Sequence, residues 1–225
     1  MWVADKLVYQ NESDFIRAYK GSEIVWVLPS GSYYIKWTPS SAEGQFNIDG
    51  TTYDLSAFGG IYYWSTGVIN RDAFSNNGTI QSIETNATSI GSSAFQSCSS
   101  LSQISLPMCS YINRGALGHC KSLSQVSIPV CSYIGVTVFA YCRSLSQLSL
   151  PVCSIIRDYA FIGCSSLSRI TIGYSGVCSL DSSVFYKTKI TSSTGSIYIP
   201  ASLVDAYKSA INWSMYSSQI FPIPE

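Results

Sequence analysis

The sequence predicts a mainly β fold in which one short segment repeats along an axis and builds a solenoid of about six coils. Three consecutive segments of equal length, which begin at Leu101, Leu123 and Leu145, are near-copies of one another. A looser copy begins at Leu167, and another lies upstream around Ile90. Apolar columns that stay in register through all of these copies are the second observation behind this fold class.

Three apolar columns keep the same register from copy to copy. A large apolar residue recurs once in every copy, with a small residue directly before it and an Ile or Leu five positions earlier. The columns are Phe74, Phe95, Leu117, Phe139, Phe161 and Phe185; Ala73, Ala94, Ala116, Val138, Ala160 and Val184; and Ile69, Ile90, Ile112, Ile134, Ile156 and Leu180. Such regularity is typical of a repeat architecture.

Each repeat predicts two short strands. The stretch LSQISLP alternates apolar and polar residues, which predicts a strand with an apolar inner face that ends at the proline. A second extended piece follows around the Ile column, and Phe and Ala then fill a bend. We expect neighbouring coils to pair as parallel strands about 4.8 Å apart. A coil buries its apolar edge only against its neighbours, so the array needs a cap at both ends.

Residues 1–65 lack this register and predict an N-terminal β cap, with residues 66–190 as the solenoid and 191–225 as a C-terminal cap. KLVYQN, DFIRAYKGSEIVWVLP and YYIKWTP are predicted as strands, with a turn at Lys20-Gly21-Ser22 and a hairpin around Asp49-Gly50. We expect the cap to pack on the first coil through Tyr53, Phe58 and the run Tyr62-Tyr63-Trp64.

The C-terminal cap is predicted as a strand at residues 196–200 followed by a helix. Ser202-Leu203-Val204-Asp205 has the form of a capping box, and the helix is expected to continue to about Trp213. Its apolar residues would share one face and cover the last coil. These residues are Leu203, Val204, Tyr207, Ala210 and Ile211.

Composition excludes several classes of function. The 13 basic and 13 acidic residues cancel, and no basic cluster exists, so nucleic-acid binding is not expected. The longest apolar run, Ile24 to Leu28, is too short to span a membrane. Residues 1–20 carry several charges, so the sequence holds no signal-peptide stretch there. A neutral chain rich in Ser and Tyr is typical of a surface or exported protein.

Cysteine recurs every 11 residues from Cys98 to Cys164, twice in each of the three near-identical copies, and Cys178 falls out of step. Each coil therefore places two cysteines at opposite corners, so we expect two vertical stacks. Parallel Cβ vectors hold stacked Cβ atoms near ~4.8 Å, beyond the ~3.8 Å of a disulfide, which favours buried free thiols while leaving disulfides as an alternative. The chain has no C-x-x-C pair and only His119 as histidine, so no metal and no cofactor are predicted.

The sequence predicts no catalytic residue and hence no enzyme. His119 adjoins Cys120, but neighbouring side chains in an extended piece point apart, and Cys120 belongs to the buried stack. No acidic residue lies near His119 in sequence. The carboxylates at 49, 54, 72 and 84 offer no pair that the sequence selects.

The repeat L-x-x-I-x-L-P-x-C-x-x-I-x-x-x-A-F-x-x-C-x-S resembles the BspA-like leucine-rich repeats of the treponemal subclass over roughly residues 66–190. Leu117, Val138, Val184 and Gly173 depart from this pattern. The resemblance implies a right-handed leucine-rich-repeat solenoid and a non-enzymatic bacterial protein that binds or adheres at the cell surface, often in oral or gut organisms. The segment around Tyr19-Lys20-Gly21-Ser22 resembles modules of phage tail-associated proteins, which leaves a structural or receptor-binding part of a phage or prophage particle as the alternative. The expected location is therefore extracellular or cell-surface, or else the virion.

Outward strand positions are the candidate binding residues. The first column is Gln103, Gln125, Gln147 and Arg169, and the second is Ser105, Ser127, Ser149 and Thr171. Together they predict a flat lattice of neutral donors and acceptors for a protein or glycan partner. The alternative is a solvated face that binds nothing, and the aromatic residues of 33–64 are the rival patch. The sequence indicates neither the ligand nor the oligomeric state.

Overall fold

The computed structural model describes residues 67–224 except residues 79 and 86, and also the backbone of seven strands within residues 1–66. Those strands are β1 (Lys6–Tyr9), β2 (Ile16–Lys20), β3 (Glu23–Trp26), β4 (Ile35–Pro39), β5 (Gln45–Ile48), β6 (Thr51–Asp54) and β7 (Ile61–Tyr63). β1, β2 and β3 form an antiparallel sheet, and β5 pairs with β6 so that Ile48 lies opposite Thr51, as the predicted hairpin requires. The predicted packing through Tyr53, Phe58 and Tyr62-Tyr63-Trp64 lies outside the described residues, as do the side chains of 33–64.

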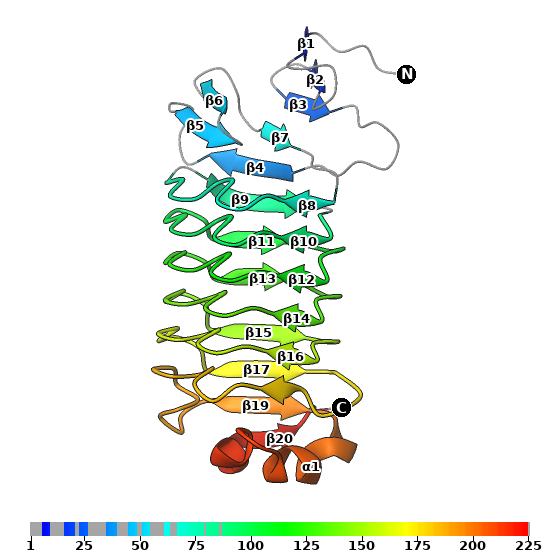
Figure 1. The fold of residues 1–225 in the computed structure, drawn as a ribbon, viewed down its shortest axis with the longest axis vertical. Coiled ribbons are helices and arrows are strands. Elements are labelled where there is room, and N and C mark those ends of the chain that lie inside the picture. The colour runs from blue at the N-terminus through cyan, green and yellow to red at the C-terminus, as the bar shows by residue number, and fades with distance from the viewer. Residues whose placement is uncertain are drawn as a thin grey trace.

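One face of the solenoid is a parallel sheet of six strands that run one above another (Figure 1). Its strands are β8 (Val68–Ile69), β10 (Ser89–Ile90), β12 (Tyr111–Ile112), β14 (Tyr133–Ile134), β16 (Ile155–Ile156) and β18 (Ser179–Leu180). The register pairs each residue of the Ile column with the next, from Ile69 to Leu180. The predicted solenoid of about six coils is confirmed.

The opposite face carries the strands of the LSQISL stretches. They are β9 (Ile80–Thr85), β11 (Gln103–Ser105), β13 (Gln125–Ser127), β15 (Gln147–Leu150), β17 (Arg169–Ile172) and β19 (Ser196–Ile199), followed by β20 (Ile220–Pro222). β9 pairs with the antiparallel strand β4, which continues to β7, so these strands extend the sheet at the N-terminal end. The parallel strands divide into two sheets, with β9, β11 and β13 in one and β15, β17, β19 and β20 in the other.

The core between the faces is a column of stacked rings. Phe74 stacks on Phe95 with ring centroids 5.0 Å apart, and Phe161 lies 5.3 Å from Phe139 and 5.7 Å from Phe185. Leu117 interrupts the column, and all of these side chains are buried. The apolar columns read from the sequence are therefore the core of the solenoid, because each coil adds one large side chain to the same stack.

Serine ladders explain the abundance of serine. Directly before strands β11, β13 and β17, Ser102, Ser124 and Ser168 donate their hydroxyls to backbone oxygens of the preceding coil. Ser110, Ser132 and Ser154 do the same before the strands of the other face. Each of these carbonyls also accepts a backbone N–H of the following coil, so the hydroxyl adds one more hydrogen bond between neighbouring coils at the corner.

The C-terminal helix is shorter than predicted. A 3-10 turn, η1, spans Ala201–Leu203, and α1 spans only Val204–Ser209 with no side-chain hydrogen bond at its N-cap, so the expected capping box at Ser202 is wrong. Ser202 lies inside the 3-10 turn, where it cannot act as a helix cap. The chain becomes extended at Ala210, and a second 3-10 segment, η2, follows at Ser214–Gln219. Because the helix has ended, Ile211 is 85% exposed instead of packed on the predicted apolar face.

The C-terminal segment nevertheless packs on the last coil. Tyr207 and Trp213 are buried, and Trp213 lies beside the last ring of the column, Phe185. The Tyr207 hydroxyl accepts a hydrogen bond from the Cys178 N–H, and the Trp213 indole donates one to the Cys178 carbonyl. Asn212 donates to the Leu180 carbonyl. These side chains bond backbone groups of β18 and of Cys178 directly before it, and β18 has no further strand to pair with among the described residues. No helix in the described part of the chain is long and apolar enough to cross a membrane.

Candidate functional site

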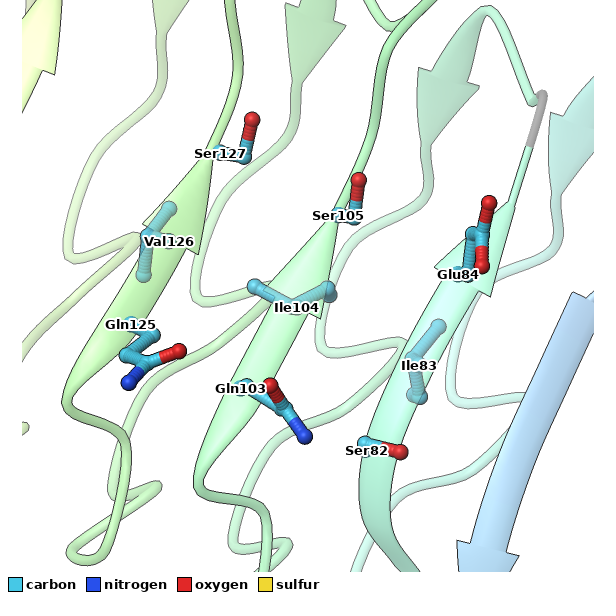
Figure 2. Close-up of a pocket in the computed structure, with 9 residues that line it drawn as sticks. All are labelled: Ser82, Ile83, Glu84, Gln103, Ile104, Ser105, Gln125, Val126 and Ser127. Atoms are coloured by element: carbon cyan, nitrogen blue, oxygen red, sulfur yellow. The ribbon is translucent and has the colours of Figure 1, made fainter.

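The strands of one face bring the predicted binding residues into two rows. Gln103 pairs with Gln125 and Ser105 with Ser127, while Gln147 pairs with Arg169 and Ser149 with Thr171. We call these eight residues the polar face: Gln103, Gln125, Gln147, Arg169, Ser105, Ser127, Ser149 and Thr171. Figure 2 shows part of it, with Gln103 and Gln125 in one row and Ser105 and Ser127 in another. Whether this face binds a partner stays a prediction.

Two open grooves lie along the polar face. The upstream groove, of about 380 Å³, is lined by residues of β9, β11 and β13 (Figure 2). The downstream groove, of about 400 Å³, is lined by residues of β13, β15 and β17 together with Ser124. Volumes of this size are in the range of small-molecule and sugar sites. Ser105 lines only the upstream groove, and Ser149 only the downstream one.

The polar face differs from the serine ladders in its hydrogen bonding. In the described part of the chain, the side chains of Gln103, Gln125 and Gln147 have no hydrogen-bond partner, and neither do those of Ser105, Ser127 and Ser149. The three glutamines are exposed. Corner serines therefore hold neighbouring coils together, while amides and hydroxyls of the face remain open to an external partner.

The two grooves carry opposite charges. Glu84 lines the upstream groove and Arg169 the downstream one, and each is the single charged residue of its lining within the described structure. The Arg169 guanidinium lies 4.2 Å from the ring centroid of Tyr198, in a cation–π contact. Phe221 lies beyond Tyr198, with the two ring centroids 6.2 Å apart.

Sequence reasoning missed Glu84 and Tyr198, which extend the second row of the polar face at both ends. Glu84 pairs with Ser105, and Tyr198 pairs with Thr171. The signal was present in part: the β9 sequence IQSIET has the same alternation as the later strands and lies one coil upstream of them. Tyr198 follows a longer coil, and the sequence alone does not fix its register.

All eight cysteines are buried free thiols. Cys98, Cys120, Cys142 and Cys164 form one stack, in which each thiol donates to a carbonyl of the preceding coil. Cys109, Cys131, Cys153 and Cys178 occupy the other corner. Burial raises the pKa of Cys109 to about 11 and that of Cys164 to about 12. Such thiols remain protonated at neutral pH and are poor nucleophiles.

The other candidates for chemistry do not converge. His119 is exposed and stacks on Tyr141 with ring centroids 4.9 Å apart, whereas the neighbouring Cys120 thiol is buried and donates to the Phe95 carbonyl. Asp72 pairs with Arg71 at 3.2 Å, away from Glu84 in its groove. Among the described residues, no group of three or more His, Cys, Asp or Glu side chains is placed to hold a metal ion.

Comparison with known proteins gives a family. A family model described as "BspA type Leucine rich repeat region" matches residues 67–191 and 132–220, with six copies. No curated protein matches.

Four solved chains match, and two of them show the extent of the likeness. A leucine-rich cell surface protein from Faecalibacterium prausnitzii is 17% identical, with a TM-score of 0.33, and the match covers 76% of this chain and 56% of that one. A leucine-rich repeat protein from Bacteroides ovatus is 16% identical, with a TM-score of 0.32, and the match covers 90% of this chain and 59% of that one. The match therefore spans little more than half the length of either solved protein.

Proposed function

The chain belongs to the BspA-type leucine-rich repeat family, and from this premise we propose that it is a non-enzymatic binding or adhesion protein that presents its polar face to a protein or glycan partner at a bacterial cell surface. A solenoid offers an extended surface, because every coil contributes the same outward positions to it. The setting of a phage or prophage particle remains the alternative, in which the same face would contact a receptor.

One observation carries the proposal. The amides and hydroxyls of the polar face have no partner within the described residues, although the serines at the corners of the same coils do. An unpaired amide or hydroxyl in a groove both donates and accepts, so it can replace the water around a polar ligand. This contrast favours recognition over a purely solvated surface.

The experiment places charge on the face without disturbing the core. Gln125→Glu combined with Gln147→Glu puts two carboxylates on strands β13 and β15 at exposed positions. We expect the double variant to lose the partner that the wild type selects from a glycan array and a host-surface pull-down. Binding by the wild type should depend weakly on salt, because few charges take part.

A matched control comes from the turn between the two faces. Val130 and Val152 are 43% and 42% exposed and, like the two glutamines, occupy equivalent positions one repeat apart. Val130→Glu combined with Val152→Glu adds the same two charges away from the grooves and should leave binding intact. Equal binding by the polar-face variant and the wild type would show that this face is only solvated surface.

A further inference from the structure

We propose that the downstream groove is a subsite for an acidic sugar, with Arg169 as the group that takes its carboxylate. The inference deepens the proposed function and rests on it. It starts from a break in the sheet, which the near-identity of the repeats does not predict.

The backbone ladder of the polar face is interrupted between β13 and β15. The N–H groups of Ser124 and Gln125 both donate to Ser102, and two coils later those of Ser168 and Arg169 both donate to Ser146. Within the described residues, no backbone hydrogen bond joins β13 to β15, and the two strands belong to different sheets. Figure 1 shows β13 and β15 more widely separated than their neighbours.

The serine ladder breaks at the same place. Ser102, Ser124 and Ser168 each donate a hydroxyl to the preceding coil, but the hydroxyl of Ser146 has no such bond within the described residues. Val126 is only partly buried, whereas the equivalent Ile104 and Leu148 are buried. The opposite face stays continuous here, because β14 still pairs with β16. The two neighbouring coils are therefore unpaired at the polar face and paired at the opposite face.

The break leaves polar backbone groups on both walls of the downstream groove, beside the open amides of Gln125 and Gln147. Some Cα atoms of β13 and β15 remain within 8 Å of one another. Two strands that flank an inserted strand need about 9.6 Å, twice the usual spacing, so an added peptide strand does not fit. Hydroxyl groups of a sugar fit such a gap, since each can donate to one wall and accept from the other.

The positive charge of the downstream groove favours an acidic sugar over a neutral one. Arg169 is the single charged residue of the downstream groove, and it forms no ion pair with any described residue. Its cation–π contact with the Tyr198 ring uses no hydrogen bond, and no described residue accepts one from the guanidinium, so its N–H donors are available for a carboxylate. An acidic sugar therefore matches both the amides of the groove and the charge at its end.

The test measures dissociation constants for a panel of oligosaccharides that contain uronic or sialic acid, each paired with its methyl ester, and for a pentaglutamate peptide. We expect acid forms to bind the wild type and their esters to bind about tenfold more weakly, the size of one lost charge-assisted contact. Arg169→Gln should weaken the acid forms by the same factor and leave the esters unchanged, with thermal melting as the check on folding.

Two tryptophan variants locate the site. Ser149→Trp fills the downstream groove and should abolish binding, whereas Ser105→Trp fills the upstream groove and should leave it intact. The inference is overturned if no acidic sugar binds, if ester and acid bind equally, if the two tryptophan variants behave alike, or if pentaglutamate binds more tightly than the sugars. A partner that is lost with the Gln125→Glu and Gln147→Glu variant but kept with Arg169→Gln overturns this inference alone and leaves the proposed function standing.

Discussion

At the scale of single residues, the cysteine stacks show how a repeat uses small apolar side chains. Each thiol fits a corner where coils approach closely, and its S–H donates to a backbone carbonyl, so no disulfide is needed to hold the corner. Burial keeps the proton on most of these sulfurs. Reactivity toward thiol reagents should therefore report folding.

We predict that a thiol reagent such as Ellman's reagent labels few cysteines in the native protein at pH ~8 and nearly all eight after denaturation without reductant. The reason is that the thiolate is the reactive form, and burial raises the pKa of Cys109 to about 11 and that of Cys164 to about 12. Four or fewer thiols in the denatured, unreduced protein would instead indicate disulfides.

The same pKa values predict a dependence of stability on pH. Unfolded cysteine titrates at pH ~8.5, below the folded pKa of about 11 for Cys109, so the unfolded state loses its protons first. The contribution of such a thiol to stability is complete below pH ~8.5 and falls by about 1.4 kcal/mol per pH unit up to the folded pKa. Urea denaturation at several pH values should show this loss, and it should be smaller in Cys109→Ala. An equal pH dependence in both proteins would contradict it.

Left-handed backbone at the corners gives another prediction. Gly163 and Gly115 have φ angles of 70° and 65°, which cost an alanine about 1 kcal/mol. A Cβ on Gly163 would lie 2.6 Å from the Tyr141 ring, whereas on Gly115 it would meet nothing closer than 3.5 Å. Gly163→Ala should therefore lower the free energy of unfolding by about 1–3 kcal/mol more than Gly115→Ala does. Chemical denaturation measures both, and equal losses would show that the ring moves freely.

At the scale of elements, sequence periodicity predicted the strands and their register well. The Ile and Phe columns lie where the repeat places them, because burial on one face of a strand fixes register. The helix was predicted less well. Its start depends on how the chain leaves Pro200, and its end on long-range bonds such as that of Asn212 to Leu180, neither of which is visible in a local pattern.

The missing pairing between β13 and β15 could not be predicted from the sequence either. Its two sides carry the same residues, with Gln125 and Ser127 on β13 and Gln147 and Ser149 on β15. A repeat that is identical in sequence predicts continuous pairing. The positions of the candidate site residues could thus be predicted, but neither the two grooves nor the break between β13 and β15.

Hydrogen exchange tests the break. Because no backbone bond joins β13 to β15 in the described structure, the amides of Ser146 and Gln147 should exchange faster than those of their counterparts in neighbouring coils. The counterparts Ser124, Gln125, Ser168 and Arg169 donate to the preceding coil and serve as internal controls. Exchange at one common rate through all three coils would show that the ladder is closed in solution.

At the scale of the whole molecule, each coil is stabilised by packing on its neighbours through one continuous core. The rings of the Phe column pack on their neighbours along the axis, and the last, Phe185, is covered by Trp213 and Tyr216 of the C-terminal segment. In such a one-dimensional array, the end coils have a single neighbour and depend on their caps. The C-terminal segment also bonds backbone groups of Cys178 and of β18, so its removal acts on both the core and the sheet edge.

Deletion of residues 196–225 should therefore cause aggregation or broad, non-cooperative unfolding. The truncation removes β19, β20 and α1, uncovers Phe185, and leaves the edges of β17 and β18 unpaired. Exposed apolar surface next to open strand edges favours association between chains. Light scattering and a thermal melt would measure the effect, with Tyr186→Phe as a control, since that ring is 52% exposed and lies outside the cap. A truncated protein that stays monomeric and melts as sharply as the full chain would mean that the solenoid ends stably at β18, and that the segment is an appendage.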